Sequence, residues 1–248
     1  MKISARFHAT QVRNASKALD VALPSALVVK LDQADQIATT TETMLGTRGD
    51  LNAAILDAIE RGDDYHDDPL VRRYALDWQI ANFQGHGVQE AATERAMQRR
   101  RDALNAHANQ VLAAWAAALK PHSANLAAAA AGLPNHRLDD AGAVIAAGLE
   151  AVELWQGAQR AVKAWGAATA GFVAFASAAR VATDDYRWLI FTDAEVPSAG
   201  RHVDAWSLAC LGHALALPTL KEFQERVAAA LPADDLGVDG GLDEFDVA

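Results

Sequence analysis

The sequence contains little cysteine, few aromatic residues and little glycine, and these scarcities exclude several classes of protein. Among 248 residues there is one cysteine, Cys210, so no intrachain disulfide can form, and aromatic residues make up only 6%. A secreted domain stapled by disulfides is therefore excluded. Glycine is too scarce for collagen, and 51% hydrophobic residues are too many for a wholly disordered chain. A single thiol fits a reducing compartment, so we expect a cytoplasmic protein, or a virion protein if a phage encodes it.

Long apolar runs and surplus positive charge are also missing. The most apolar window, 164–182, consists mostly of alanine and glycine and contains Arg180, which favours a buried helix over a membrane span. Residues 1–6 lack the apolar core of a signal peptide. The formal net charge is −10, which does not suit the neutralisation of nucleic-acid phosphates. We therefore expect neither a membrane nor a nucleic-acid partner.

Alanine is abundant, at close to a quarter of the chain, and it is the best helix former and is depleted in strands. The predicted fold class is all-α: a helical bundle round a long antiparallel hairpin of about 69–120 and 138–190, with shorter flanking helices. We expect 1–62 to be an N-terminal helical segment and 63–231 to be the hairpin bundle with the C-terminal helices. Residues 232–248 are expected to form an acidic disordered tail.

Capping residues predict where the helices begin and end. Residues 25–43 and 51–61 have a helical pattern, and Gly62 is placed to end the second of them. Asp68 before Pro69 predicts the start of the hairpin, and Pro121 predicts the end of its first helix. The segment 85–87 is expected to interrupt this helix, and Asp139 or Asp140 to begin the next. Two further helices are expected at 203–217 and 220–230, and 1–8 reads as a short strand or a frayed helix.

Apolar residues recur at helical spacing and predict which faces are buried. In the short helix 51–61 the predicted face is Leu51, Ile55, Ala58 and Ile59. The same spacing, sustained along both long helices, suggests a core or coiled-coil stripe. Its predicted members are Met97, Leu104, Ala108, Val111, Trp115 and Ala118, then Ile145, Leu149, Val152, Trp155, Gln159, Val162, Gly166, Thr169, Val173 and Ala176.

The segment Asp63-Asp64-Tyr65-His66-Asp67 is the most specific match to a known chemistry in the sequence. It resembles the DDxxD box of class I terpene synthases and prenyl transferases, which are also all-α. The resemblance implies that Asp63, Asp64 and Asp67 hold Mg²⁺, which bridges the carboxylates to a diphosphate. The alternative is a solvated acidic loop that caps the following helix, because Gly62 and Pro69 bracket the segment.

Other catalytic patterns are incomplete. The second metal box of that family has its best candidate at Asp184-Asp185, but Trp188 stands where Ser or Thr is needed and Thr192 where Glu is needed. Glu150 and Glu153 have the first spacing of the all-α pyrophosphohydrolases, but the second motif of that family does not follow. We interpret these two glutamates as a solvated pair on one helix face.

Two charged segments suggest binding rather than catalysis. The chain has one basic cluster, at Arg95, Arg99, Arg100 and Arg101, for which pairing with Glu94 and Asp102 within the helix is the simplest interpretation. A patch for a phosphate or an acidic partner is the alternative. The acidic tail interleaves acids with apolar anchors, so it is either a solubilising tail or a docking motif. The candidate docking residues are Leu242, Asp243, Glu244, Phe245, Asp246 and Val247.

These observations favour a non-enzymatic interaction or assembly protein, such as a structural component of a bacterial or phage particle. Its expected partner is another protein or a second copy of the chain, because a long hairpin buries its apolar stripe poorly alone. No cofactor is expected under this hypothesis. Two alternatives stay open: a Mg²⁺-dependent enzyme that acts on a diphosphate through the acidic loop, and an adaptor that docks its acidic tail.

Overall fold

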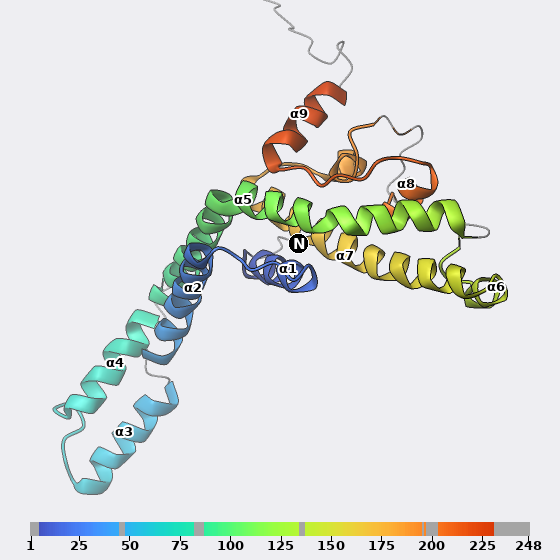
Figure 1. Cartoon of the computed structure of the whole chain (residues 1–248). Coiled ribbons are helices and arrows are strands. Elements are labelled where there is room, and N and C mark those ends of the chain that lie inside the picture. The colour runs from blue at the N-terminus through green and yellow to red at the C-terminus, as the bar shows by residue number, and fades with distance from the viewer. Residues whose placement is uncertain are drawn as a thin grey trace, which may run out of the picture. The chain divides into compact units, whose positions relative to one another are not determined.

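The computed structural model describes residues 5–44, 48–81, 87–133, 137–194, 196 and 203–230. This part of the chain is all-α, as predicted, and contains no strand (Figure 1). None of its helices combines the length and the apolar character needed to cross a membrane. The elements are α1 (Ala5–Ala18), α2 (Ser25–Met44), α3 (Arg48–Arg61), α4 (Pro69–Ala81), α5 (Val88–Gly132), α6 (Ala141–Ala146), α7 (Leu149–Ala179), the 3-10 helix η2 (Asp184–Ile190), α8 (Ala205–Cys210) and α9 (Leu220–Ala230).

The chain divides into two compact units, and both long helices contribute to each of them. Unit 1 comprises residues 1–111 and 167–180, and unit 2 comprises 112–166 and 181–248. The helices α5 and α7 therefore each contribute one part to unit 1 and the other part to unit 2. The domain boundaries expected at 62 and 231 stay predictions.

In unit 1, the first part of α5 lies beside α2, and α1 is joined to α2 by charged side chains. Arg100 on α5 donates two hydrogen bonds to Asp35 on α2, and Arg13 on α1 donates to Asp32 and Asp35. The hydrophobic core of this unit is built mainly from aliphatic and phenylalanine side chains. Its fully buried members include Val12, Leu27, Leu31, Leu104, Phe172 and Phe175.

Unit 1 also contains an antiparallel pair of short helices, α3 and α4, joined by residues 62–68 (Figure 1). We call this pair the α3–α4 hairpin. Its buried side chains are small: Ala54 and Ala58 on α3 and Val71 on α4.

In unit 2, the second part of α5 runs antiparallel to the first part of α7 (Figure 1). Asn125 on α5 and Gly157 on α7 line the same cavity. The core contains Trp115 and Trp165, and the ring of Trp165 lies 5.7 Å from that of Phe191. The helix α9 packs on η2, where Phe223, Leu189 and Ile190 are buried. Arg226 on α9 also contacts this region. Its guanidinium donates hydrogen bonds to the carbonyls of Leu189, at 2.9 Å, and Ala216, at 3.3 Å.

Pro121 does not end the first long helix, so this prediction is wrong. The helix α5 continues through Pro121 to Gly132. A proline in a helix interior removes one backbone donor, here the partner of the Ala117 carbonyl, and it carries a substantial cost. Burial offsets that cost, because Leu119 and Leu126 on either side of the proline are both buried. Tertiary packing therefore overrides the local signal.

The second long helix begins later and ends earlier than predicted. Asp140 caps the short helix α6 through the amide of Ala143, and the chain then breaks at Ala147-Gly148 before α7 begins. Gly148 has φ +99°, a conformation that glycine adopts without strain. Ile145 and Leu149, on either side of this break, are 70% and 76% exposed, and Gly166 within α7 is exposed as well, so the predicted stripe is wrong at these three positions.

The segment 184–190 is a 3-10 helix rather than a continuation of the hairpin. Only Ala205–Cys210 of the predicted helix 203–217 is helical, whereas α9 has the predicted bounds. At the other end of the chain, α1 begins at Ala5, so for residues 5–8 the structure supports the helix rather than the strand of the two alternatives.

Candidate functional site

The acidic loop lies at the turn of the α3–α4 hairpin, and its backbone is fixed by the end of α3. Gly62 has φ +77°, and its amide donates to the carbonyl of Ile59, while the amide of Asp63 donates to the carbonyl of Ala58. A left-handed glycine with these two bonds satisfies carbonyls that the end of a helix leaves open. The loop between Gly62 and Pro69 is therefore the predicted one.

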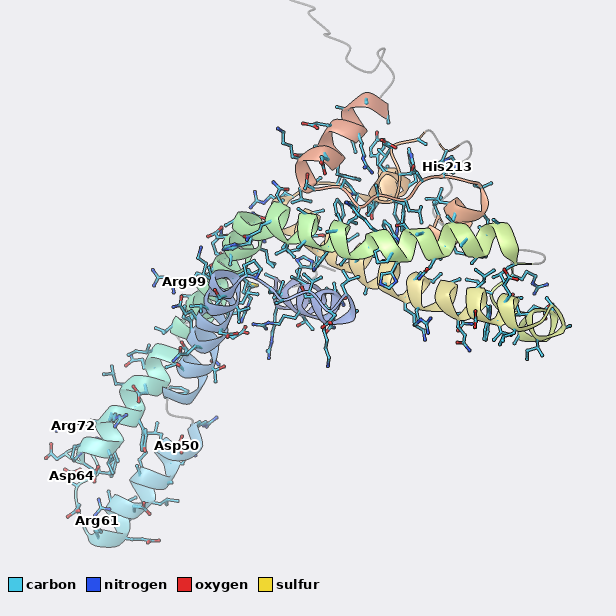
Figure 2. The ribbon with its side chains drawn as sticks, in the orientation of Figure 1. Asp50, Arg61, Asp64, Arg72, Arg99 and His213 are labelled. Carbon is cyan, nitrogen blue, oxygen red and sulfur yellow. The ribbon has the colours of Figure 1, made fainter. Side chains whose placement is uncertain are left out.

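Two arginines bind the carboxylates of this loop. Arg61 at the end of α3 donates to Asp63 at 2.9 Å and to Asp68 at 2.6 Å. Arg72 in the first turn of α4 pairs with Asp67 and also donates to the carbonyl of His66. Figure 2 shows Arg61, Asp64 and Arg72 together at the loop end of the hairpin, with Asp50 at the other end of α3.

The remaining oxygens of the loop serve the backbone. Asp64 accepts a hydrogen bond from the amide of His66, and Asp68 accepts from the amides of Leu70 and Val71 at the start of α4. These amide bonds, first of all that from Val71, lower the pKa of Asp68, and Arg61 lowers it further. The carboxylates of Asp63, Asp67 and Asp68 thus contact arginines, and those of Asp64 and Asp68 cap the backbone.

This arrangement bears on the predicted Mg²⁺ ligands, Asp63, Asp64 and Asp67. Each of the three contacts a different group, namely Arg61, the amide of His66, and Arg72. Within the described ranges, no group of three or more histidine, cysteine, aspartate or glutamate side chains is placed to hold a metal ion. The ion pairs and hydrogen bonds of the loop therefore close the α3–α4 hairpin.

The basic cluster on α5 separates into side chains with different surroundings. Arg100 is buried and donates to Oδ1 of Asp35 through Nε at 2.9 Å and Nη2 at 2.7 Å. Arg99 lines a cavity of about 540 Å³ with Gln33, Gln36, Ile37, Thr40 and Thr41 of α2.

The two other arginines of the cluster differ again. Arg101 lies near His8, where burial, and then the charge of Arg101, lower the pKa of the imidazole. Arg95 is exposed. The four arginines therefore do not share one surface, and the important partner of Arg100 is on another helix rather than within α5.

The pair Glu150 and Glu153 lines a cavity of about 310 Å³ in unit 2 together with Asn125, Leu154 and Gly157. Two carboxylates and an amide lie there without a second acidic pair. The pyrophosphohydrolase pattern requires two acidic motifs, whereas the described residues of this cavity supply one. The candidate docking residues Leu242, Asp243, Glu244, Phe245, Asp246 and Val247 lie outside the described residues.

The feature that sequence reasoning missed is the outer surface of the α3–α4 hairpin. Leu56 and Ile59 on α3 are 60% and 54% exposed, and Leu76 and Ile80 on α4 are 56% and 36% exposed. The predicted apolar face of α3 is therefore wrong at Ile59. A usable signal was present, because Leu56–Ile59 and Leu76–Ile80 have the spacing of neighbours on one helix face.

Each of these pairs lies on the side of its helix that faces away from the hairpin's interior. Leu56 is two residues from both Ala54 and Ala58, which places it on the opposite side of α3 from these buried alanines. On α4, Ile80 is nine residues from the buried Val71, which again corresponds to the opposite side. We call these surfaces the outer face of α3 (Leu56, Ile59) and the outer face of α4 (Leu76, Ile80).

Comparison with known proteins gives no relative from which to transfer a function. No protein-family model matches the chain, and neither the curated proteins nor the solved structures that were searched contain a match.

Proposed function

We propose that this chain is a non-enzymatic helical assembly protein that self-associates through the α3–α4 hairpin. The observation that carries the proposal is a pair of large apolar side chains on the outer side of each helix of that hairpin. The buried positions between α3 and α4 are alanine and valine, while Leu56 and Leu76 are more than half exposed to water.

Leaving these apolar surfaces in water costs free energy that a partner can recover. Burying a leucine or isoleucine side chain is worth about 1.5–3 kcal/mol relative to leaving it exposed. Single exposed apolar residues are ordinary, but pairs at i,i+3 and i,i+4 on two neighbouring helices form the kind of face that a partner covers. In the interior of the α3–α4 hairpin, Leu70 and Tyr74 of α4 line a cavity together with Ala54 of α3, whereas the outer faces of both helices are exposed to water.

The test is the mass in solution by light scattering over a wide range of concentration. We expect the unmodified chain to form an oligomer, and a Leu56→Asp/Leu76→Asp variant to shift toward monomer. The matched control is Ile145→Asp/Leu149→Asp, which places the same charges on two exposed apolar residues of unit 2. Circular dichroism should show unchanged helix content in both variants, because all four positions are exposed.

Two other results would redirect the proposal. A mass equal to one chain at every concentration contradicts it and leaves Mg²⁺ titration of the acidic loop as the next measurement. An oligomer that dissociates when the chain is ended at residue 231, but not on hairpin substitution, assigns the association to the acidic tail.

A further inference from the structure

We infer that the partner of the α3 outer face is the α4 outer face of a second copy of this chain, so that copies join head-to-tail. This inference rests on the proposed self-association and adds its geometry. It names the occupant of each face and predicts that one copy can bind two others.

The outer faces of α3 and α4 match in the kind and size of their apolar side chains. Each presents two large aliphatic side chains one helical turn apart, Leu56 with Ile59 and Leu76 with Ile80. The helices are 14 and 13 residues long, which corresponds to about 20 Å each. Their ridges can therefore pack along nearly the whole length of both helices.

The two faces also carry charged residues of opposite sign. Beside Leu56 and Ile59, α3 has the exposed carboxylate of Glu60, whereas α4 has Arg73 beside Leu76, with 69% of its side chain exposed. The contact of Arg73 within its own helix, to Asp77, is 3.9 Å long. Its guanidinium has five N–H donors, so most of them can bind another carboxylate.

These charges discriminate between the two ways of pairing. A symmetric contact of α3 with α3 brings two Glu60 carboxylates together, and one of α4 with α4 brings two Arg73 guanidinium groups together. A contact of α3 with α4 brings Glu60 and Arg73 within reach of each other. Complementary charges of this kind set register and exclude the wrong partner.

Head-to-tail pairing has a consequence that symmetric pairing lacks. Each copy that uses its α3 face in one contact keeps its α4 face for another, so the chain builds rings or open filaments rather than closed dimers. A contact between two short helices is smaller than the roughly 800 Å² per partner of a standard interface. Each contact is therefore weak, and assembly depends on concentration.

The experiment blocks one face at a time and then mixes the products. The α3-blocked variant is Leu56→Asp/Ile59→Asp, and the α4-blocked variant is Leu76→Asp/Ile80→Asp, both in the full chain. At a concentration where the unmodified chain assembles, we expect each variant alone to be a monomer. An equimolar mixture should form a dimer of one copy of each and nothing larger, because one intact contact remains. Mass by light scattering reads all three samples.

The outcomes separate this inference from the proposed function. If the unmodified chain assembles but the mixture gives no dimer, the head-to-tail pairing is wrong while self-association stands. If one blocked variant still assembles alone, the other face pairs with itself, which also overturns the inference. If the unmodified chain is a monomer throughout, the proposed function fails. Should an aspartate variant lose helix content, the corresponding alanine variants repeat the test with the same expectations.

Charge reversal gives an independent readout that does not remove apolar surface. Glu60→Lys alone and Arg73→Glu alone should each raise the concentration for half-assembly by about fivefold, the effect of a partly exposed ion pair. The double variant, with both charges exchanged, should return it close to that of the unmodified chain. Failure of the double variant to recover contradicts the pairing of these two residues.

Discussion

The helices α3 and α9 are both short and amphipathic, but they differ in whether their large apolar side chains are buried. In unit 2, α9 buries Phe223 and Leu220 and leaves Lys221, Glu222 and Glu225 exposed. In unit 1, α3 buries Ala54 and Ala58 and leaves Leu56 and Ile59 exposed. The apolar face of α9 is thus used within its own unit, whereas that of α3 is left for a partner.

The surroundings of the two helices explain the difference. The helix α9 packs on η2, where Leu189 and Ile190 are also buried, and Arg226 donates to two backbone carbonyls nearby. The helix α3 packs against α4 with the small residues Ala54, Ala58 and Val71 at its buried positions. A close contact made of small residues brings two helices together without hiding their large residues.

The largest expected effect tests this comparison directly. Phe223→Ala should lower the free energy of unfolding by about 3–5 kcal/mol, because it leaves a cavity in a fully buried site. Leu56→Ala should change it by only about 0.5 kcal/mol in a dilute, monomeric sample, because the side chain is already in water. Urea unfolding followed by circular dichroism measures both. Equal losses would mean that Leu56 is buried in solution.

The ion pairs of unit 1 allow the same contrast between buried and exposed groups. Asp35→Ala leaves the buried guanidinium of Arg100 without its acceptor and should cost about 3 kcal/mol of unfolding free energy. Asp32→Ala is the matched control, because Asp32 also pairs with an arginine, Arg13, but at an exposed site. This variant should lower the free energy of unfolding by less than about 1 kcal/mol. A small loss for both would show that water reaches Arg100.

Local signals predicted most helix ends, since these depend on neighbouring residues alone. The pair Asp68-Pro69 gave the start of α4, Gly62 gave the end of α3, and Asp140 proved to be a true cap. The capping pair Thr219 and Glu222 is an equally readable signal at the start of α9. In each case the hydrogen-bond partner lies within three residues.

Features that depend on distant residues could not be predicted in this way. The proline rule failed at Pro121, because burial along α5 outweighs the lost backbone bond. The partner of Arg100 is Asp35, which lies 65 positions away and therefore outside any helical spacing rule. In a chain so rich in alanine, the buried face of α3 could not be chosen by size, because the smallest residues are the ones that pack.

The smallest expected effect concerns the cap of α9 and its dependence on pH. The amide of Thr219 donates to the carboxylate of Glu222 at 2.7 Å, which holds the pKa of Glu222 below its usual range, and Arg226 nearby lowers it further. A carboxyl whose pKa is lower in the folded state stabilises the fold above its ordinary pKa, and it loses that contribution as the pH falls through the folded value.

We therefore expect Glu222→Gln to lower the free energy of unfolding by less than about 1 kcal/mol at pH 7, since the group is exposed to water and screened. This difference should vanish as the pH is lowered through the folded pKa of Glu222, because the carboxyl is then neutral in both states. Urea unfolding of the two chains at neutral and acidic pH measures it. A loss that persists unchanged in acid would show that the shape of the Glu222 side chain, rather than its charge, determines the stability of α9.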